Sequence, residues 1–213
     1  LKNFFTFGYQ YCKEYHTHFK FDIEQESGTE SQSTHSLFVQ DEMDFSPLNV
    51  MLGTRIDNHN KWGTVVNPNG GLLYRLTDDL KLRGSVGRAF KEPPMCHLYT
   101  VDLFQSTHWT RANPDLEPEK SWGYQIGAEY EIGDDFTTKV AFFRNDIEDM
   151  IEQYDTGEDS IYAGSNYPIY SYKNIDEVYT QGVEFVIQQQ FSDWESARLG
   201  YTWLESRDLS LIH

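Results

Sequence analysis

The stretch "SWGYQIGAEYEI", residues Ser121 to Ile132, alternates between two kinds of residue along its whole length. The even positions from Trp122 to Ile132 are aromatic or aliphatic, and the odd positions from Ser121 to Glu131 are polar or glycine. Successive side chains of a β-strand point to opposite faces, so this pattern predicts a strand with one apolar and one polar face.

The same period of two recurs along the chain and predicts nine strands, with no helix. The alternation is weaker in two of these strands, at residues 35–45 and 135–143. The predicted strands contain residues 5–11, 35–45, 48–56, 72–76, 80–86, 121–132, 135–143, 180–191 and 197–203.

The connections between these strands are alternately short and long. Four are tight, at 45–48, 76–80, 132–136 and 191–194, and they are rich in the Asp, Ser, Pro and Gly that turns favour. Long polar stretches fill 13–34, 57–68, 88–119, 144–177 and the residues beyond 205. This arrangement predicts an up-and-down antiparallel sheet with all its long loops at one end.

A soluble β-sandwich would also alternate apolar and polar residues. Two features favour a transmembrane β-barrel instead. The strands reach the roughly ten residues that a tilted strand needs to cross a bilayer. Aromatic residues also gather near strand ends, as the interfacial girdles of such barrels do: Phe45, Trp122, Tyr130, Phe136, Phe191, Trp194 and Trp203. Because bacterial single-chain barrels close with an even number of strands, nine strands predict a segment of a larger barrel.

Composition excludes several other classes of protein. The net charge of −17 over 213 residues argues against nucleic acid as a partner. No run of about 18 apolar residues predicts a transmembrane helix, and the first residues do not resemble a signal peptide. We find no Ser-His-Asp arrangement with motif support, no phosphate-binding glycine loop and no zinc-hydrolase spacing, so we do not expect an enzyme.

Two motifs flank the longest central loop. The segment "GRAFKEPPMCHLY", residues 87–99, resembles the box R-x-F-R-A-P-x-x-x-E-L-Y of TonB-dependent outer-membrane receptors, although Lys91, Glu92 and His97 depart from it. The segment "NPDLEPEKSWGYQIGAEY", residues 113–130, resembles a second box of that family. Five further segments match the family in the same order, at 38–42, 53–59, 142–151, 172–185 and 200–208. The matching residues of the two boxes include Arg88, Phe90, Pro93, Leu98, Tyr99, Asn113, Pro114, Leu116, Pro118 and Glu119.

The resemblance implies a barrel of about twenty-two strands whose lumen is filled by an N-terminal plug domain. In this family the plug engages TonB, which drives uptake of a scarce, bulky ligand. Neither plug nor coupling segment lies in these 213 residues, so residues 1–213 are expected to form one partial barrel domain from its middle. The expected partners are the TonB complex through the plug, outer-membrane lipid and lipopolysaccharide, and an iron chelate as cargo. No resident cofactor is expected, and a passive porin or adhesin barrel is the alternative by class.

Residues 91–119 should then form an extracellular loop. Tandem prolines at 93–94 fix φ and remove two backbone donors, which ends strand pairing there. The motif residues Arg88, Phe90, Pro93, Asn113, Pro114, Leu116, Pro118 and Glu119 are interpreted as architectural. The candidate ligand-binding residues within the loop are His97, His108, Tyr99, Trp109 and Arg111.

Three kinds of cargo fit the loop residues. A histidine between the two boxes binds haem iron in some family members, which makes His97 and His108 candidates. The tyrosine-rich stretch 162–172 would suit a ferric siderophore, because aromatic faces stack on flat chelates. Soft ligands Met95, Cys96 and His97 would suit copper, and His16 and His18 beside the acidic stretch 21–30 would suit zinc. A corrinoid remains a further alternative, and a disulfide between Cys12 and Cys96 is left open.

Overall fold

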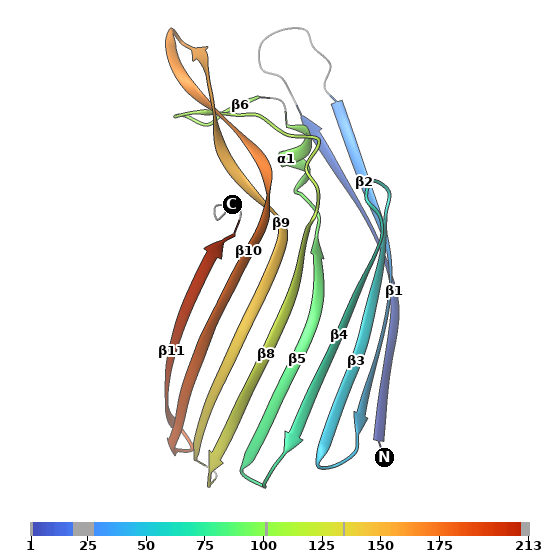
Figure 1. The fold of residues 1–213 in the computed structure, drawn as a ribbon, viewed down its shortest axis with the longest axis vertical. Helices are drawn as coiled ribbons and strands as arrows, with labels where there is room; N and C mark the ends of the chain where they lie inside the picture. The colour runs from blue at the N-terminus through green and yellow to red at the C-terminus, as the bar shows by residue number, and fades with distance from the viewer. Residues whose placement is uncertain (1, 19–27, 101, 134, 210–213) are drawn as a thin grey trace.

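The computed structural model describes residues 2–18, 28–100, 102–133 and 135–209. Within these residues the chain forms one curved antiparallel sheet that is built almost entirely from consecutive neighbours (Figure 1). Nine strands of 12 to 28 residues form the wall, as the alternation predicted, and two strands of two residues lie above it. The wall strands are β1 (Lys2–His18), β2 (Gly28–Asp44), β3 (Leu48–His59), β4 (Gly63–Arg75), β5 (Leu80–Lys91), β8 (Glu119–Ile132), β9 (Phe136–Tyr162), β10 (Ser165–Ser192) and β11 (Glu195–Asp208).

The four predicted tight turns are confirmed. They join β2 to β3, β4 to β5, β8 to β9 and β10 to β11, and they lie together at the lower end of the wall in Figure 1. The long connection between β5 and β8 lies at the opposite end, which we call the rim.

One face of the wall is apolar across successive strands. Register places Leu82 beside Ala128, Ala128 beside Val140, Val140 beside Phe185, and Phe185 beside Tyr201. Most of these side chains are exposed in the isolated chain. A continuous exposed apolar band on one face of a sheet is what contact with lipid requires, so this face is the outer face.

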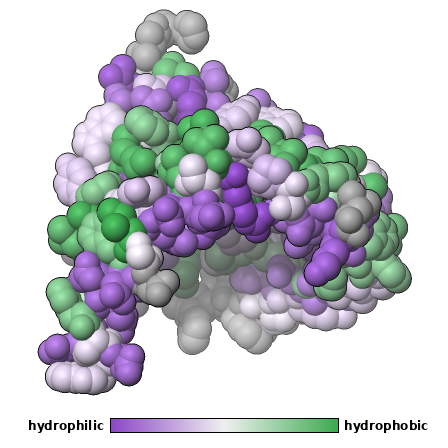
Figure 2. Space-filling view, turned by 90° about the horizontal axis from the view of Figure 1, so that it is seen from below, coloured by the Kyte–Doolittle hydropathy of each residue, from purple (hydrophilic) through white to green (hydrophobic). Residues whose placement is uncertain are grey.

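The opposite, concave face carries the polar half of the alternation. Its central carboxylate, Glu129, is buried among three cations: Lys81 at 3.7 Å, Arg83 at 3.2 Å and Lys139 at 3.0 Å. The concave face encloses a hollow of about 1260 Å³. Figure 2, which views the protein from the tight-turn end, shows the wall bending round this hollow, with hydrophobic and hydrophilic residues interleaved along it.

Two predicted loops are strands in the structure. Residues 57–68 are a tight hairpin in which β3 ends at His59 and β4 begins at Gly63, whose φ of +74° suits glycine. Residues 144–177 continue β9 and β10 into a long hairpin that turns at Ala163 and Gly164 and rises above the wall (Figure 1). β1 and β2 likewise extend into the predicted loop 13–34, whose residues 19–27 lie outside the described part. The sequences of these extensions lack the regular alternation from which the other strands were predicted.

The expectation that the chain has no helix was also wrong. A single turn of helix, α1 (Met95–Tyr99), follows the two prolines and buries Met95 and Leu98. Five residues are too few to show a helical period. Among the described residues, no helix is long and apolar enough to cross a membrane.

Candidate functional site

The rim loop, residues 92–118, has a fold of its own in its described residues. It contains α1, β6 (Leu103–Phe104) and β7 (Trp109–Thr110). β5 stops at Lys91, directly before Glu92 and the prolines, and Pro93 is fully buried. Proline has no N–H to continue the ladder, so the chain leaves the sheet here, as its sequence predicted.

The middle of the loop attaches to the long β9–β10 hairpin. β7 pairs in parallel with β10, Trp109 with Ile169 and Thr110 with Tyr170. The backbone N–H of Arg111 then donates to the carbonyl of Tyr170 at 2.8 Å. The loop therefore adds a short strand to the hairpin, and these backbone bonds hold the two together.

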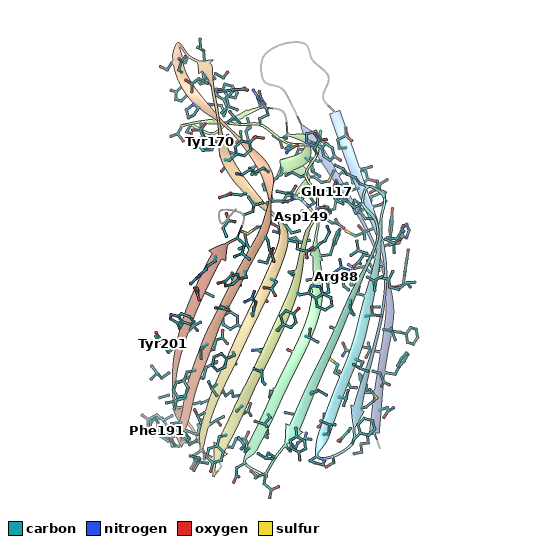
Figure 3. All side chains as sticks on the ribbon, in the orientation of Figure 1. Arg88, Glu117, Asp149, Tyr170, Phe191 and Tyr201 are labelled. Atoms are coloured by element: carbon teal, nitrogen blue, oxygen red, sulfur yellow. The ribbon has the colours of Figure 1, made fainter. Side chains whose placement is uncertain are left out.

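The end of the loop is fixed to the root of the hairpin by Asn174 of β10. Its side-chain oxygen accepts from the N–H of Glu117 at 2.9 Å, and its amide nitrogen donates to the carbonyl oxygens of Glu117 at 2.8 Å and of Asp149 at 2.6 Å. Asp149 has a φ of +57°, which is uncommon for a residue other than glycine. Figure 3 shows Glu117 and Asp149 near each other where the hairpin leaves the wall.

Two residues of the second box reinforce this attachment. The Asn113 side chain donates to the carbonyl of Tyr172 at 2.9 Å, and its backbone N–H donates to the carbonyl of His97 at 2.8 Å. The Glu119 carboxylate accepts from the N–H of Ile151 at 2.9 Å and pairs with Lys91 at 2.7 Å. We call Asn113, Glu117, Glu119, Asp149 and Asn174 the clasp, because together they tie the end of the rim loop and the start of β8 to the hairpin.

The remaining motif residues have varied surroundings. Leu116 is only 1% exposed and Pro118 is buried, whereas Pro114 is exposed and its carbonyl accepts from the Lys61 ammonium at 2.8 Å. Arg88 lies on the wall below the loop (Figure 3) and donates to the carbonyl of Val66 at 3.2 Å. Phe90 lines a cavity beneath the loop.

His97 and His108 lie against two tyrosines that are two residues apart on β10. The His97 ring stacks on Tyr172, with ring centres 3.8 Å apart and planes at 13°. His108 meets Tyr170 edge-on at 4.9 Å and contacts the hydroxyl of Thr107 at 3.1 Å. Burial lowers the pKa of His97, and the nearby Lys91 lowers it further against the opposing effect of Glu119. His97 is therefore held in its neutral form, in which a ring nitrogen keeps a lone pair.

Two aromatic residues of the rim loop, Phe104 and Trp109, form a cluster with two tyrosines of the hairpin. The Phe104 ring lies 5.3 Å from Trp109, 4.3 Å from Tyr162 and 4.8 Å from Tyr167. We call these four residues the aromatic cluster. Nearby, Arg111 pairs with Glu158 at 2.9 Å and with Asp102 at 3.5 Å.

The structure separates the other candidate ligands. Tyr99 lies beside the Lys61 ammonium, Met95 is buried, and Cys96 is exposed. His16 reaches the hydroxyl of Thr100 at 3.2 Å. His18 ends β1, but its side chain and residues 19–27 lie outside the described part. Over the described ranges, no group of three or more His, Cys, Asp or Glu side chains could hold a metal ion.

Both cysteines are free and exposed, so the structure does not form the disulfide that the sequence left open. Cys12 lies within the β1–β2 ladder, and Cys96 lies on α1 in the rim loop.

Sequence reasoning missed the hairpin side of the clasp. Asn174 and Asp149 both lie in segments that match the family pattern, yet neither was singled out. A polar residue whose partners are backbone groups of a distant segment leaves no periodic signal in the sequence. Tyr170 and Tyr172 were noted only as part of the tyrosine-rich stretch 162–172.

The outer apolar band, the polar concave face and the rim loop together define a wall of an outer-membrane β-barrel. The family model described as "TonB dependent receptor-like, beta-barrel" matches residues 2–210. The chain belongs to this family of TonB-dependent receptors.

Individual proteins agree with this assignment. The ferric enterobactin receptor of Pseudomonas aeruginosa is 28% identical over 182 residues, which cover 78% of this chain and 24% of that protein. The vitamin B12 transporter BtuB of Vibrio vulnificus is 28% identical over 126 residues, covering 59% of this chain and 19% of that protein. The crystal structure of the siderophore receptor PirA from Pseudomonas aeruginosa superposes with a TM-score of 0.72 at 20% identity, over 85% of this chain and 36% of that one. The chain thus spans about a quarter or less of the length of these curated relatives.

Proposed function

We propose that the protein containing this chain is an outer-membrane receptor that binds an iron chelate at the rim and imports it with energy from TonB. The observation that carries the proposal is the rim loop, which the clasp fixes on a barrel wall of the receptor family. A loop held in this way presents its side chains in a defined arrangement, which lowers the entropic cost of binding. The plug and its contact with TonB are proposed from family membership.

A ferric siderophore with aromatic groups is the cargo that we place first. The aromatic cluster offers ring faces and edges for flat groups. Arg111 is a weaker candidate, because Glu158 and Asp102 already pair with its guanidinium. A relative is named as a ferric enterobactin receptor, which supports the same class of cargo. Haem is the second candidate, because His97 and His108 lie against neighbouring tyrosines and the pKa of His97 favours the neutral ring that binds iron. The similarity to BtuB, which is named a vitamin B12 transporter, makes a corrinoid the third candidate cargo.

Titrations of the purified full-length receptor with ferric enterobactin, haem and cobalamin separate these cargoes. Ferric enterobactin should quench tryptophan fluorescence saturably, and Trp109→Ala should weaken binding at least tenfold while His108→Ala leaves it within a factor of two. Haem should give no Soret shift that saturates at one equivalent. The opposite pattern, a stoichiometric Soret shift abolished by His97→Ala or His108→Ala, would make the protein a haem receptor. Failure of ferric enterobactin, haem and cobalamin to bind would refute the proposal for these cargoes.

We also propose lipopolysaccharide as the lipid partner, at a charged belt above the apolar band on the outer face. Arg144 pairs with Asp146 at 2.7 Å and donates to Gln181 at 3.4 Å, while Arg207 pairs with Glu205 at 2.5 Å. Guanidinium groups bind phosphates directly, and carboxylates can do so through divalent cations. Receptor purified with Arg144→Ala and Arg207→Ala together should retain less lipopolysaccharide than the parent. Equal retention would refute this role for the belt.

A further inference from the structure

A polar cavity of about 580 Å³ lies in the concave face beneath the start of the rim loop. Its wall is built from β1, β2 and β3, and the register of the first two strands sets Cys12 beside Thr34 and Glu14 beside Gln32. Residues 92–95 of the rim loop also line it. The volume is within the usual range for small-molecule sites.

The lining of the cavity contains a hydrogen-bond donor that no described residue engages. Gln32 is only 4% exposed and lines the cavity, yet its amide nitrogen has no hydrogen-bond partner among the described residues. Most buried polar side-chain atoms in folded proteins have such a partner. The amide of Gln32 therefore marks a position at which a bound molecule should supply an acceptor.

Two carboxylates of the lining keep the capacity to accept further hydrogen bonds. Glu14 lies directly beside Gln32 in the register, and no cation among the described residues pairs with it. Glu92 accepts from the hydroxyl of Thr34 at 3.1 Å, which uses one of the roughly four lone-pair positions of a carboxylate. The cavity thus combines one unpaired donor with acceptors that still have room for donors.

Arg55 offsets part of the negative charge of the lining. Its guanidinium donates to Asp57 at 2.8 Å and to Ser36 at 2.8 Å. It also acts on Glu92, because burial raises the pKa of Glu92 and Arg55 is among the groups that lower it. The cavity therefore does not require a cationic ligand, and hydrogen bonding decides what fits it.

We propose that this cavity binds a small neutral saccharide. A hydroxyl group both accepts and donates hydrogen bonds. One hydroxyl can therefore accept from Gln32 while it and its neighbour on the sugar ring donate to Glu14 and Glu92. Phe90 and the prolines at 93–94 give the lining an apolar part, against which the C–H face of a sugar ring can pack.

Other classes of ligand match the lining less well. A metal ion or an ammonium group offers no acceptor, so it would leave the amide nitrogen of Gln32 unpaired. An anionic chelate would meet the carboxylates of Glu14 and Glu92. The saccharide site therefore differs in ligand from the rim loop that we propose to bind cargo, and the inference does not depend on which cargo the rim binds.

Cys12 provides a probe inside the cavity, because it lines the site and is a free, exposed thiol. The full-length receptor carrying Cys96→Ser is treated with N-ethylmaleimide, and modification of Cys12 is timed by peptide mass spectrometry. Glucose, galactose, N-acetylglucosamine, maltose and sucrose are added in turn at millimolar concentration. At least one of them should slow modification saturably, by at least about fivefold, whereas glycerol and butylammonium should leave the rate nearly unchanged.

Variants of the lining test the assigned contacts. Gln32→Met removes the unpaired donor at similar size, and Glu14→Gln removes one carboxylate. Each should raise the saccharide concentration that gives half protection by about three- to tenfold, whereas the control Glu152→Gln, at an exposed position of the hairpin, should leave it unchanged. Gln32→Met should also raise the melting temperature of the receptor without saccharide, because it removes a buried amide that lacks a partner. A lower melting temperature together with unchanged protection would contradict the role of Gln32.

A second measurement does not need the thiol. Saturation-transfer NMR on the full-length receptor should show transfer to the protecting saccharide, and Gln32→Met should reduce it. Trp109→Ala, which tests the cargo proposal, should leave this transfer unchanged, so the two proposals can fail separately. Absence of both protection and transfer for all the saccharides would overturn the proposal, as would protection by butylammonium that Glu14→Gln abolishes.

Discussion

Asn174→Ala tests the clasp most sharply, because one side chain makes three hydrogen bonds to the backbone of two other segments. Each such bond contributes about 0.5–1.5 kcal/mol net. Because Glu117 is exposed, water can replace part of the hydrogen bonding that its backbone groups lose. The total effect of losing the three bonds should therefore lie below the upper part of their summed free energy. We expect the free energy of local opening at the end of the rim loop to fall by about 2–3 kcal/mol.

Hydrogen exchange measures this quantity directly. A fall of about 2–3 kcal/mol raises exchange of the protected amides roughly 30- to 150-fold. The amide of Glu117, which donates to Asn174, and that of Ile151, which donates to Glu119, should respond most. Asn174→Asp keeps the acceptor and loses both donors, so its effect should be intermediate.

The matched control is Asn166→Ala, because Asn166 is exposed near the tip of the same hairpin. It should leave exchange at Glu117 and Ile151 within a factor of two of the parent. The reasoning is refuted if Asn174→Ala does the same, or if it speeds exchange equally throughout β1–β5.

Three further changes test other parts of the structure. Gly182→Ala would bring a methyl group against the carbonyl of Trp203 and should lower the melting temperature of the barrel, whereas Gly200→Ala, which meets open space, should change it little. Burial lowers the pKa of His59, and the nearby Lys61 lowers it further. The neutral His59 ring should therefore contribute fully to the free energy of unfolding above pH 6.5, and this contribution should be lost as the pH falls below that value. His59→Asn keeps a hydrogen-bond acceptor but does not titrate. The variant should therefore lose the part of the pH dependence of the melting temperature between pH 8 and 5 that His59 causes, and a pH dependence equal to that of the parent would contradict this role of His59. Glu119→Ala leaves a backbone N–H of β9 unpaired and should lower the free energy of opening of the rim loop by about 1–3 kcal/mol. Glu119→Gln should lower it by under about 1 kcal/mol, because it loses mainly an exposed ion pair. Equal effects of the two variants on hydrogen exchange would contradict this.

The sequence predicted the wall well because lipid imposes a simple rule on it. One face of each strand must be apolar and the other must not, so segments such as Ser121–Ile132 show the period of two over their whole length. The turns at 45–48 and 76–80 could be found for a related reason, since they interrupt that period with turn-forming residues.

The hairpin and the clasp could not be predicted, because the requirement for one apolar face applies only to the membrane-spanning part of the strands and not to the rim. Residues 144–162 continue β9 as strand, but their sequence lacks the apolar alternation, so hydrophobicity did not mark them. The role of Asn174 depends on the carbonyl of Asp149 and on both backbone groups of Glu117, which only the folded chain brings together. The two histidines were correctly assigned to the rim loop, but their stacking on Tyr172 and Tyr170 depends on how the loop folds onto the hairpin.

TonB-driven import of an iron chelate is tested most directly by uptake of radioactive iron supplied as ferric enterobactin, in cells that lack their own siderophore receptors and express the full-length protein. We expect saturable uptake that needs both the protein and TonB and that falls with Trp109→Ala. Uptake that is absent, or that proceeds equally without TonB, would contradict it.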